Sequence, residues 1–164
     1  MRTIKKRRRL ENKTDYKSRL VMLKSELPRV VFRKTNKYII GQLVRSNEAR
    51  DEISVGLDSR SLIDYGWPKD SKSIKSSPAA YLTGFLLGKK IVDKEGEIRA
   101  IFDLGLQRSI AKSRAYAFLK GVIDAGVKIS CNEEMFPDES RISGKQLKNS
   151  INVEPIKQKI EKEA

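Results

Sequence analysis

The chain contains no histidine and only one cysteine, Cys131, among its 164 residues. These absences exclude a zinc finger and most transition-metal sites, which need several imidazole or thiolate ligands. They also exclude Ser-His-Asp and Cys-His catalysis, and a lone cysteine cannot form an internal disulfide. We therefore expect no metal site, no cofactor and no catalytic residue.

Long apolar runs are also missing. No segment approaches the roughly 20 consecutive apolar residues that a helix needs to cross a bilayer. The basic N-terminus has no apolar segment behind its charges, so it does not resemble a secretory signal. The sequence thus predicts a soluble, cytoplasmic protein with no membrane partner and no small-molecule substrate.

Positive charge is what the chain has in excess. Lys and Arg total 35 against 21 Asp and Glu, which gives a formal net charge of +14. The first 24 residues alone hold ten of these cations and only two acids. Such a balance favours a polyanionic partner, either nucleic acid or an anionic membrane surface.

Composition divides the chain into three parts. We expect a basic arm with a short helix over residues 1–28, a globular α/β domain over 29–132, and a polar C-terminal extension over 133–164. The extension ends in a lysine-rich tail, which we expect to be mobile because it is polar and terminal.

The arm has almost no apolar side chains between Ile4 and Lys13, so we expect it to be disordered until it meets its partner. After it, the spacing of Leu20, Leu23 and Leu27 predicts a helix with one apolar face. Pro28 should end that helix.

The domain should begin with three strands joined by short loops, an arrangement that favours an antiparallel meander. A helix capped by Ser77 and opened by Pro78 follows. A second helix, from about Ser113 to Ala125, should end at Gly126. Strands after each helix complete the order β-β-β-α-β-α-β, which predicts a mixed five-stranded sheet. The expected strands are residues 29–33, 38–44, 53–57, 98–102 and 127–131.

The basic arm is the first candidate nucleic-acid site. Clustered cations displace counterions from phosphates, and Arg adds bidentate geometry. The alternative is a solvated tail or a nuclear localisation signal, but adjacent cations repel one another and gain little in isolation. The residues are Lys5, Lys6, Arg7, Arg8, Arg9 and Lys13.

A predicted hairpin tip is the second candidate. It combines cations, hydrogen-bonding side chains and an aromatic ring that could stack on an unpaired base, although an ordinary polar turn would look the same. Its residues are Arg33, Lys34, Thr35, Asn36, Lys37 and Tyr38.

The third candidate is Arg108, Lys112 and Arg114, around the start of the second helix. Cations there oppose the helix dipole, and a bound anion would resolve the conflict. A mild, tolerated mismatch is the alternative.

Enzyme signals are weak. Asp58, Asp103 and Asp124 could be imagined as metal carboxylates, as in a nuclease of ribonuclease-H-like topology. Such a nuclease would carry an acid on its first strand, and residues 29–33 contain none. A stand-alone RNA chaperone is a further alternative, because it would show the same surplus of positive charge.

Several segments together resemble the archaeal and eukaryotic branch of ribosomal protein L eighteen, called L five in eukaryotes. Their order and spacing carry the resemblance, which covers roughly residues 5–147, and the chain length is similar to that of archaeal members. The segments are Arg7-Arg8-Arg9, Lys13-Thr14-Asp15-Tyr16 with Arg19-Leu20, Arg33 to Tyr38, Tyr65-Gly66-Trp67, Pro78 to Gly84, Asp103 to Leu106, Gly121 to Gly126, and Arg141-Ile142-Ser143-Gly144.

The resemblance implies a ribonuclease-H-like topology and a structural protein of the large ribosomal subunit rather than an enzyme. Its expected partners are 5S ribosomal RNA, the large-subunit ribosomal RNA to which it attaches 5S RNA in the central protuberance, and neighbouring large-subunit proteins. It also implies RNA contacts for Thr14, Tyr16 and Arg19, beside Arg7 to Arg9, Lys13 and the hairpin tip. A nuclease or other RNA-processing enzyme is the alternative.

Overall fold

The computed structural model describes residues 6–48, 50–69, 71, 73–144 and 152–163. Within them the chain forms a mixed α/β fold, as predicted. The strands are β1 (Arg29–Lys34), β2 (Ile39–Asn47), β3 (Arg50–Asp58) and β4 (Ile101–Asp103). The helices are α1 (Arg7–Leu10), α2 (Tyr16–Lys24), α3 (Ser77–Glu95), α4 (Arg114–Asp124), α5 (Glu139–Ile142) and α6 (Val153–Glu163), with short 3-10 turns η1 (Ser59–Ile63) and η2 (Glu133–Met135).

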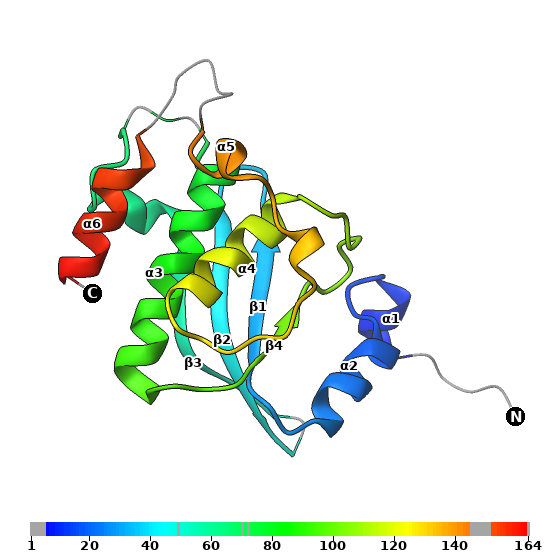
Figure 1. Ribbon diagram of the computed structural model, residues 1–164. Coiled ribbons are helices and arrows are strands. Elements are labelled where there is room, and N and C mark those ends of the chain that lie inside the picture. Colours follow the sequence, from blue (N-terminus) through cyan, green and yellow to red (C-terminus); the bar gives the residue numbers. More distant parts are fainter. Residues whose placement is uncertain (1–5, 49, 70, 72, 145–151, 164) are drawn as a thin grey trace, which may run out of the picture.

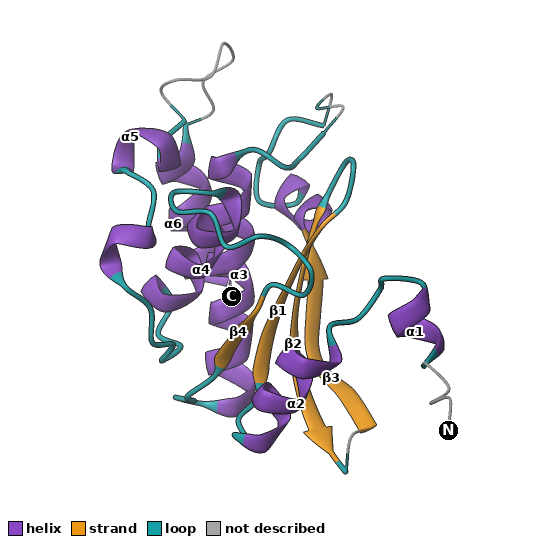
Figure 2. Ribbon diagram, turned by 90° about the vertical axis from the view of Figure 1, so that its right-hand side faces the viewer, coloured by secondary structure: helices purple, strands orange, loops and turns teal. Residues whose placement is uncertain are grey.

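The sheet has the strand order β3-β2-β1-β4. The predicted meander of β1, β2 and β3 is antiparallel throughout, and β4 returns parallel to β1. Helices α3, α4 and α6 lie on one side of the sheet, while α1 and α2 lie on the other (Figures 1 and 2). Alternation along β1 therefore sends Val30 and Phe32 into the helical core and leaves Arg29 and Arg33 for the opposite face.

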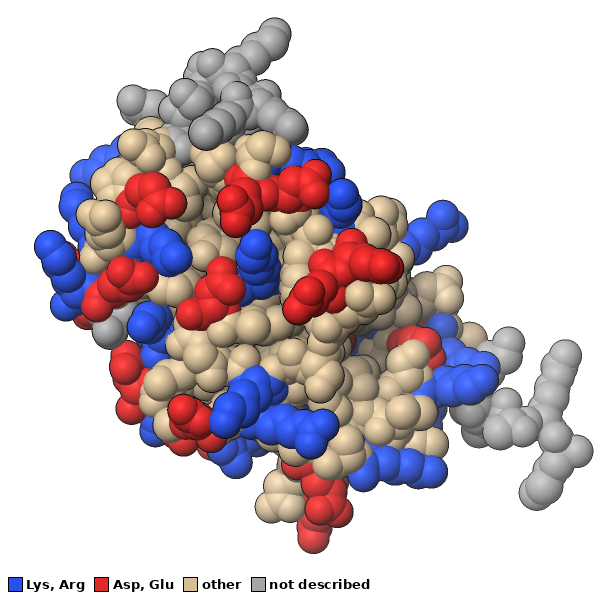
Figure 3. Space-filling model, in the orientation of Figure 1, with Lys and Arg blue, Asp and Glu red and all other residues tan. Residues whose placement is uncertain are grey.

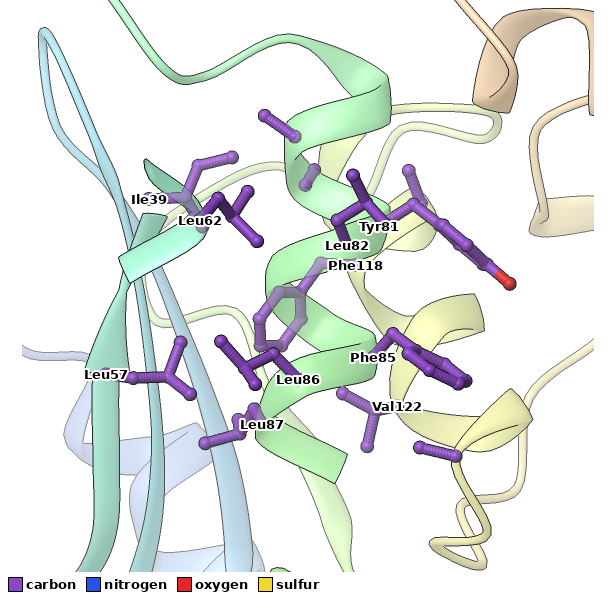
Figure 4. Close-up of a cluster of buried hydrophobic side chains, with 14 of the residues drawn as sticks. Ile39, Leu57, Leu62, Tyr81, Leu82, Phe85, Leu86, Leu87, Phe118 and Val122 are labelled. Atoms are coloured by element: carbon purple, nitrogen blue, oxygen red, sulfur yellow. The ribbon is translucent and has the colours of Figure 1, made fainter. Parts of the chain in front are cut away.

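Helix α3 is central because it is covered on two sides. Leu86 and Leu87 point toward Leu57 of β3, whereas Tyr81 and Phe85 point away from the sheet (Figure 4). These two aromatic side chains are nevertheless buried. Helix α6 contributes to this cover, since it packs against α3 through Val153, Ile156 and Ile160. Among the described residues, no helix combines the length and the apolarity required to cross a lipid bilayer.

Glycines set how closely α3 and α4 approach. A Cβ added to Gly84 would lie 2.1 Å from the carbonyl oxygen of Phe118, and one added to Gly121 would lie 2.2 Å from that of Tyr81. Both obstacles are backbone atoms, which cannot rotate aside. The two helices therefore pack backbone against backbone, and this places their N-terminal ends side by side.

The predicted fifth strand, residues 127–131, is wrong. Among the described residues this segment makes a single parallel bridge, Arg99 with Lys128. Lys128 exchanges hydrogen bonds with Ile98 and Ala100, which precede β4, so no ladder extends along β4 itself. The alternation that suggested a strand reflects the burial of Val127 and the partial burial of Ile129 against the core.

Three smaller expectations also need correction. Helix α3 is capped by Ser76, whose Oγ accepts from the amide of Ala79, rather than by Ser77. Leu20 is 56% exposed, so α2 does not rest on the predicted leucine face. The tail expected to be mobile instead forms α6.

Disorder of the free arm before binding stays a prediction. Arg7 to Leu10 form a four-residue helical turn whose residues are all exposed. The expected fourth strand, residues 98–102, is shorter and begins later, at Ile101.

Replacing Gly84 by Ala should destabilise the protein. Alanine favours a helix interior by about 1 kcal/mol over glycine, but overpacking typically costs about 1–3 kcal/mol, and here the clash is with backbone. We expect a net loss of roughly 2 kcal/mol in urea-induced unfolding. The control is Gly56→Ala, whose Cβ would meet nothing closer than 3.4 Å. Equal stability of G84A and wild type would contradict the close crossing.

Candidate nucleic-acid interface

The arm presents its cations on an exposed turn. Arg7 is 83% exposed, and Arg8 and Arg9 lie beside it in α1. Thr14 and Tyr16 hold this turn: the Arg8 guanidinium donates to Thr14 Oγ1 at 2.8 Å, and Lys6 Nζ lies 4.6 Å from the centre of the Tyr16 ring. Thr14 and Tyr16 thus position the arm's cations.

Some cations of the arm form ion pairs with an acid of the arm, and others do not. Lys13 Nζ lies 2.8 Å from a carboxylate oxygen of Glu11, and the same acid is 3.8 Å from Arg7. For Arg9 no ion pair is found within the described residues. Lys5, also predicted to bind RNA, lies outside the described residues.

The predicted hairpin tip forms between β1 and β2. Thr35 closes it, because its Oγ1 accepts from the amide of Tyr38 at 2.9 Å and its own amide donates to the Tyr38 carbonyl. The guanidinium of Arg60 lies 4.9 Å from the centre of the Tyr38 ring. Lys34, Asn36 and Lys37 are exposed. The tip therefore offers two cations and an amide, while Thr35 shapes the turn and Tyr38 has an Arg neighbour over its ring.

Two predicted contacts, Arg19 and Arg33, are held by acids of the protein itself. Arg19 makes a bidentate pair with Asp51, at 2.9 and 3.0 Å, which ties α2 to β3. Arg33 donates to Asp103 Oδ1 at 3.2 Å and to the Asp103 carbonyl at 2.9 Å. Their geometry is that of positioning residues.

Both pairs belong to a network built around Arg29, a residue that sequence reasoning did not single out. Its side chain is only 4% exposed and contacts Asp51 at 2.8 Å, Asp103 at 3.1 Å and Ser46 Oγ at 3.0 Å. Burial alone would raise the pKa of Asp51, but hydrogen bonds from Arg19 and Ser46 and the charges of Arg29 and Arg19 lower it to about 2. Asp51 therefore stays ionised at neutral pH.

The carboxylates considered as metal ligands lie in separate places. Asp103 Oδ2 accepts from Arg29, and its Oδ1 accepts from Arg33 and from the amide of Gly105 at 2.7 Å. Asp58 pairs with Arg60, and Asp124 accepts from the hydroxyl of Tyr81. Within the described residues, no three metal-ligating side chains come together. A cation at Asp103 would have to displace two guanidinium groups.

The structure does unite two of the predicted clusters. A cleft of about 860 Å³ lies where the hairpin tip meets the N-terminal ends of α3 and α4. Its cations come from three separate segments, and among the described residues that line it none is acidic. We call it the basic cleft; its charged residues are Lys34, Arg108, Lys112, Arg114 and Arg141.

Arg141 of the basic cleft was quoted in the sequence resemblance but not predicted as a contact. It belongs to α5 in the C-terminal extension, and only the fold brings it into the same cleft as Arg108. Acidic side chains lie elsewhere: Asp124, Glu133 and Glu139 surround a hollow between α4 and α5. Figure 3 shows acids interspersed with cations on this helical face, so the net positive charge is not spread evenly over the surface.

Comparison with known proteins gives consistent matches. Residues 2–97 match the family described as "Ribosomal large subunit proteins 60S L5, and 50S L18". The chain is 46% identical over 144 residues to "Large ribosomal subunit protein uL18" of Korarchaeum cryptofilum, covering 88% of this chain and 72% of that protein. It is 40% identical over 141 residues to the protein of the same name from Methanosphaera stadtmanae, covering 86% and 71%.

Asp103→Asn tests the network around Arg29. Removing one partner of a buried ion pair leaves a charge without compensation, which we expect to cost about 3 kcal/mol of unfolding free energy. The control is Glu97→Gln, which removes a pair with Lys128 whose side chains are 71% and 70% exposed. That change should cost less than about 1 kcal/mol. Equal effects of the two substitutions in urea unfolding would show that the network does not join the strands.

Asp51 should make stability depend on pH in the acid range. Its pKa is lowered from 3.8 to about 2 in the folded protein, so its contribution is complete above the unfolded pKa and is lost as pH falls through about 2. Asp51→Asn should cost on the order of 1 kcal/mol near neutrality, after allowance for solvent screening. Unfolding measured from about pH 7 to about pH 2 should show wild type and variant converging; a constant difference would contradict the assignment.

Proposed function

Because the chain belongs to the L5/L18 family of large-subunit ribosomal proteins, in its archaeal form, we propose that it binds 5S ribosomal RNA. We further propose that it attaches this RNA to the large-subunit ribosomal RNA in the central protuberance, beside neighbouring large-subunit proteins. As a family member the protein is a structural component of the ribosome, located in the cytoplasm, and is not an enzyme. The nuclease alternative is therefore wrong.

The placement of the arm carries the RNA-binding proposal. Arg7, Arg8 and Arg9 follow one another on an exposed turn that lies across the sheet from the helical core (Figure 2). Three adjacent cations in water repel one another, and a polyphosphate is the partner that removes this repulsion. The arm can thus enter between RNA segments and displace counterions from several phosphates.

The hairpin tip supplies a second, more rigid contact. Lys34, Asn36 and Lys37 are exposed on a turn that Thr35 closes by hydrogen bonds. A rigid tip with cationic and amide donors suits the shape and backbone of a folded RNA, which proteins recognise largely through phosphates, 2′-hydroxyls and unpaired bases. Tip and arm together favour one particular folded RNA over a general RNA chaperone role, which would need no such shape.

Deleting residues 1–13 should weaken binding to a 5S RNA transcript and flatten its salt dependence. If about six cations meet phosphates, log K should fall with log salt at a slope of about −4 to −5 in the wild type. The charge-only control replaces Arg7, Arg8 and Arg9 by Gln, and it should reproduce much of the deletion's effect.

Filter binding or fluorescence anisotropy over a salt series gives both slopes. A deletion variant with the wild-type slope would contradict the arm's role. The comparison RNA is a random sequence of the same length. If the wild-type protein binds this RNA as tightly as the 5S transcript, the proposed function is wrong.

A further inference from the structure

We propose that the basic cleft binds the sugar–phosphate backbone of an RNA strand, through its phosphates and not its bases. This proposal rests on the RNA-binding function proposed above and adds a second surface, distinct from the arm and partly built by the C-terminal extension.

Charge is the first argument. Lys34, Arg108, Lys112, Arg114 and Arg141 line one cleft with no acid among its described lining residues. Lys112 Nζ does pair with Asp138 at 3.0 Å, outside the lining, so its charge is partly balanced. For Arg108, Arg114 and Arg141 the described residues provide no ion pair. Like charges that converge in a concave space raise the local potential and attract an anion.

The helix ends strengthen this potential. Ser76 and Ser77 begin α3, Ser113 and Arg114 begin α4, and all four line the cleft. These helices have 19 and 11 residues, and neither has an acid in its first turn. Positive dipole ends therefore meet positive side chains, an arrangement that disfavours the empty cleft and favours one holding phosphate.

The start of α4 is also left open toward the cleft. The Ser113 side chain caps no amide of its helix, and in the described part of the chain no other side chain does so. Lys112, which precedes Ser113, has a backbone φ of +58, a left-handed conformation that residues other than glycine rarely adopt. Its amide donates to the Met135 carbonyl at 2.8 Å, so the last residue of η2 fixes this turn.

The lining selects backbone over bases. Base recognition on proteins relies on exposed aromatic rings for stacking. The one aromatic residue lining the described cleft is Phe32, which is 1% exposed and belongs to the core. The remaining polar groups are guanidinium, ammonium, hydroxyl and amide donors, which match phosphate oxygens.

Arg141 gives the C-terminal extension a part in this site. It lies on α5, whose Ile142 is buried and anchors the turn against the core. The side chain of Arg141 is thus presented to the cleft by a packed element, and its removal tests the cleft without touching α3 or α4.

The test neutralises the cleft while leaving the arm intact. The variant Arg108→Gln with Arg114→Gln should give a salt slope shallower than wild type by about 1–2, because each lost phosphate contact changes the slope by about 0.7–0.9. Affinity should fall by the same factor for the 5S transcript and for random RNA of equal length, since phosphate contacts carry no sequence information. Arg141→Gln should flatten the slope by about 1.

Lys90→Gln with Arg99→Gln is the matched control. Both residues are exposed and neither lines the cleft. Lys90 lies near the C-terminal end of α3, and Arg99 precedes β4 beside the start of β1, whereas the cleft lies at the N-terminal end of α3 and the end of β1. This variant should keep the slope of the wild type. Thermal unfolding without RNA completes the comparison: removing Arg114 from a helix N-terminus should leave the midpoint unchanged or slightly higher, since the cation opposes the dipole.

Different failures have different meanings. If the wild type prefers 5S RNA but both cleft variants keep its slope and affinity, the cleft proposal is overturned and the proposed function stands. If the cleft variants lose the preference for 5S RNA along with affinity, the cleft reads bases and the proposal is also wrong. If the wild type shows no preference but the variants flatten its slope, the cleft binds backbone and the 5S assignment fails.

Discussion

The guanidinium of Arg29 joins the elements on the side of the sheet opposite the helical core. It is almost fully buried and contacts acids from two strands, Asp51 of β3 and Asp103 of β4, as well as Ser46 of β2. Removing a charge from water costs several kcal/mol, and only complete pairing offsets that cost. The arrangement is therefore stable only with all the strands in place. Because Arg19 shares Asp51, the same network also fixes α2, which joins the cationic turn of the arm to the domain.

The ion pairs of this network divide the cations of the chain into two groups, those paired with internal carboxylates and those free to meet a partner. Arg19, Arg29 and Arg33 are occupied by internal carboxylates, so they shape the protein and leave other residues to meet a polyanion. The cations of α1 and the hairpin tip stand on the surface instead. A net charge of +14 consequently overstates the number of cations available to RNA. The exposed fraction and the ion pairs of each side chain distinguish the two groups, and composition alone cannot.

What the sequence could predict follows from the range of the interactions involved. The meander of β1 to β3 and the stripe of α4 depend on neighbours within one or two elements, so periodicity and turn residues reveal them. The pairing of Arg33 with Asp103 spans 70 positions and leaves no local signal. Residues 127–131 gave a wrong prediction for a related reason. Burial of alternate side chains against the core produces the same pattern as a strand, although the hydrogen-bonded ladder is missing.

The tail shows the same limit. Val153, Ile156 and Ile160 have helical spacing, but the surrounding lysines and glutamates suggested a solvated end. Their burial depends on a hydrophobic surface of α3 that is far away in sequence. Arg141 likewise lies in the basic cleft only because of the fold, and nothing in the nearby sequence indicates this position. The candidate site was thus predictable as three clusters of cations, whereas the meeting of two of them in one cleft was not.

Arm and cleft would contribute to RNA binding in different ways. The arm is an exposed turn of four residues with no buried side chain, so binding must also restrict its exposed side chains, at a cost in entropy. The cleft stands on two long helices packed through Gly84 and Gly121, so its cations are already close together before RNA arrives. A preorganised site loses less entropy on binding, while the arm presents its charges on an exposed turn outside the packed core. Both surfaces would add affinity through phosphate contacts, so the arm and the cleft together would hold an RNA more tightly than either surface alone.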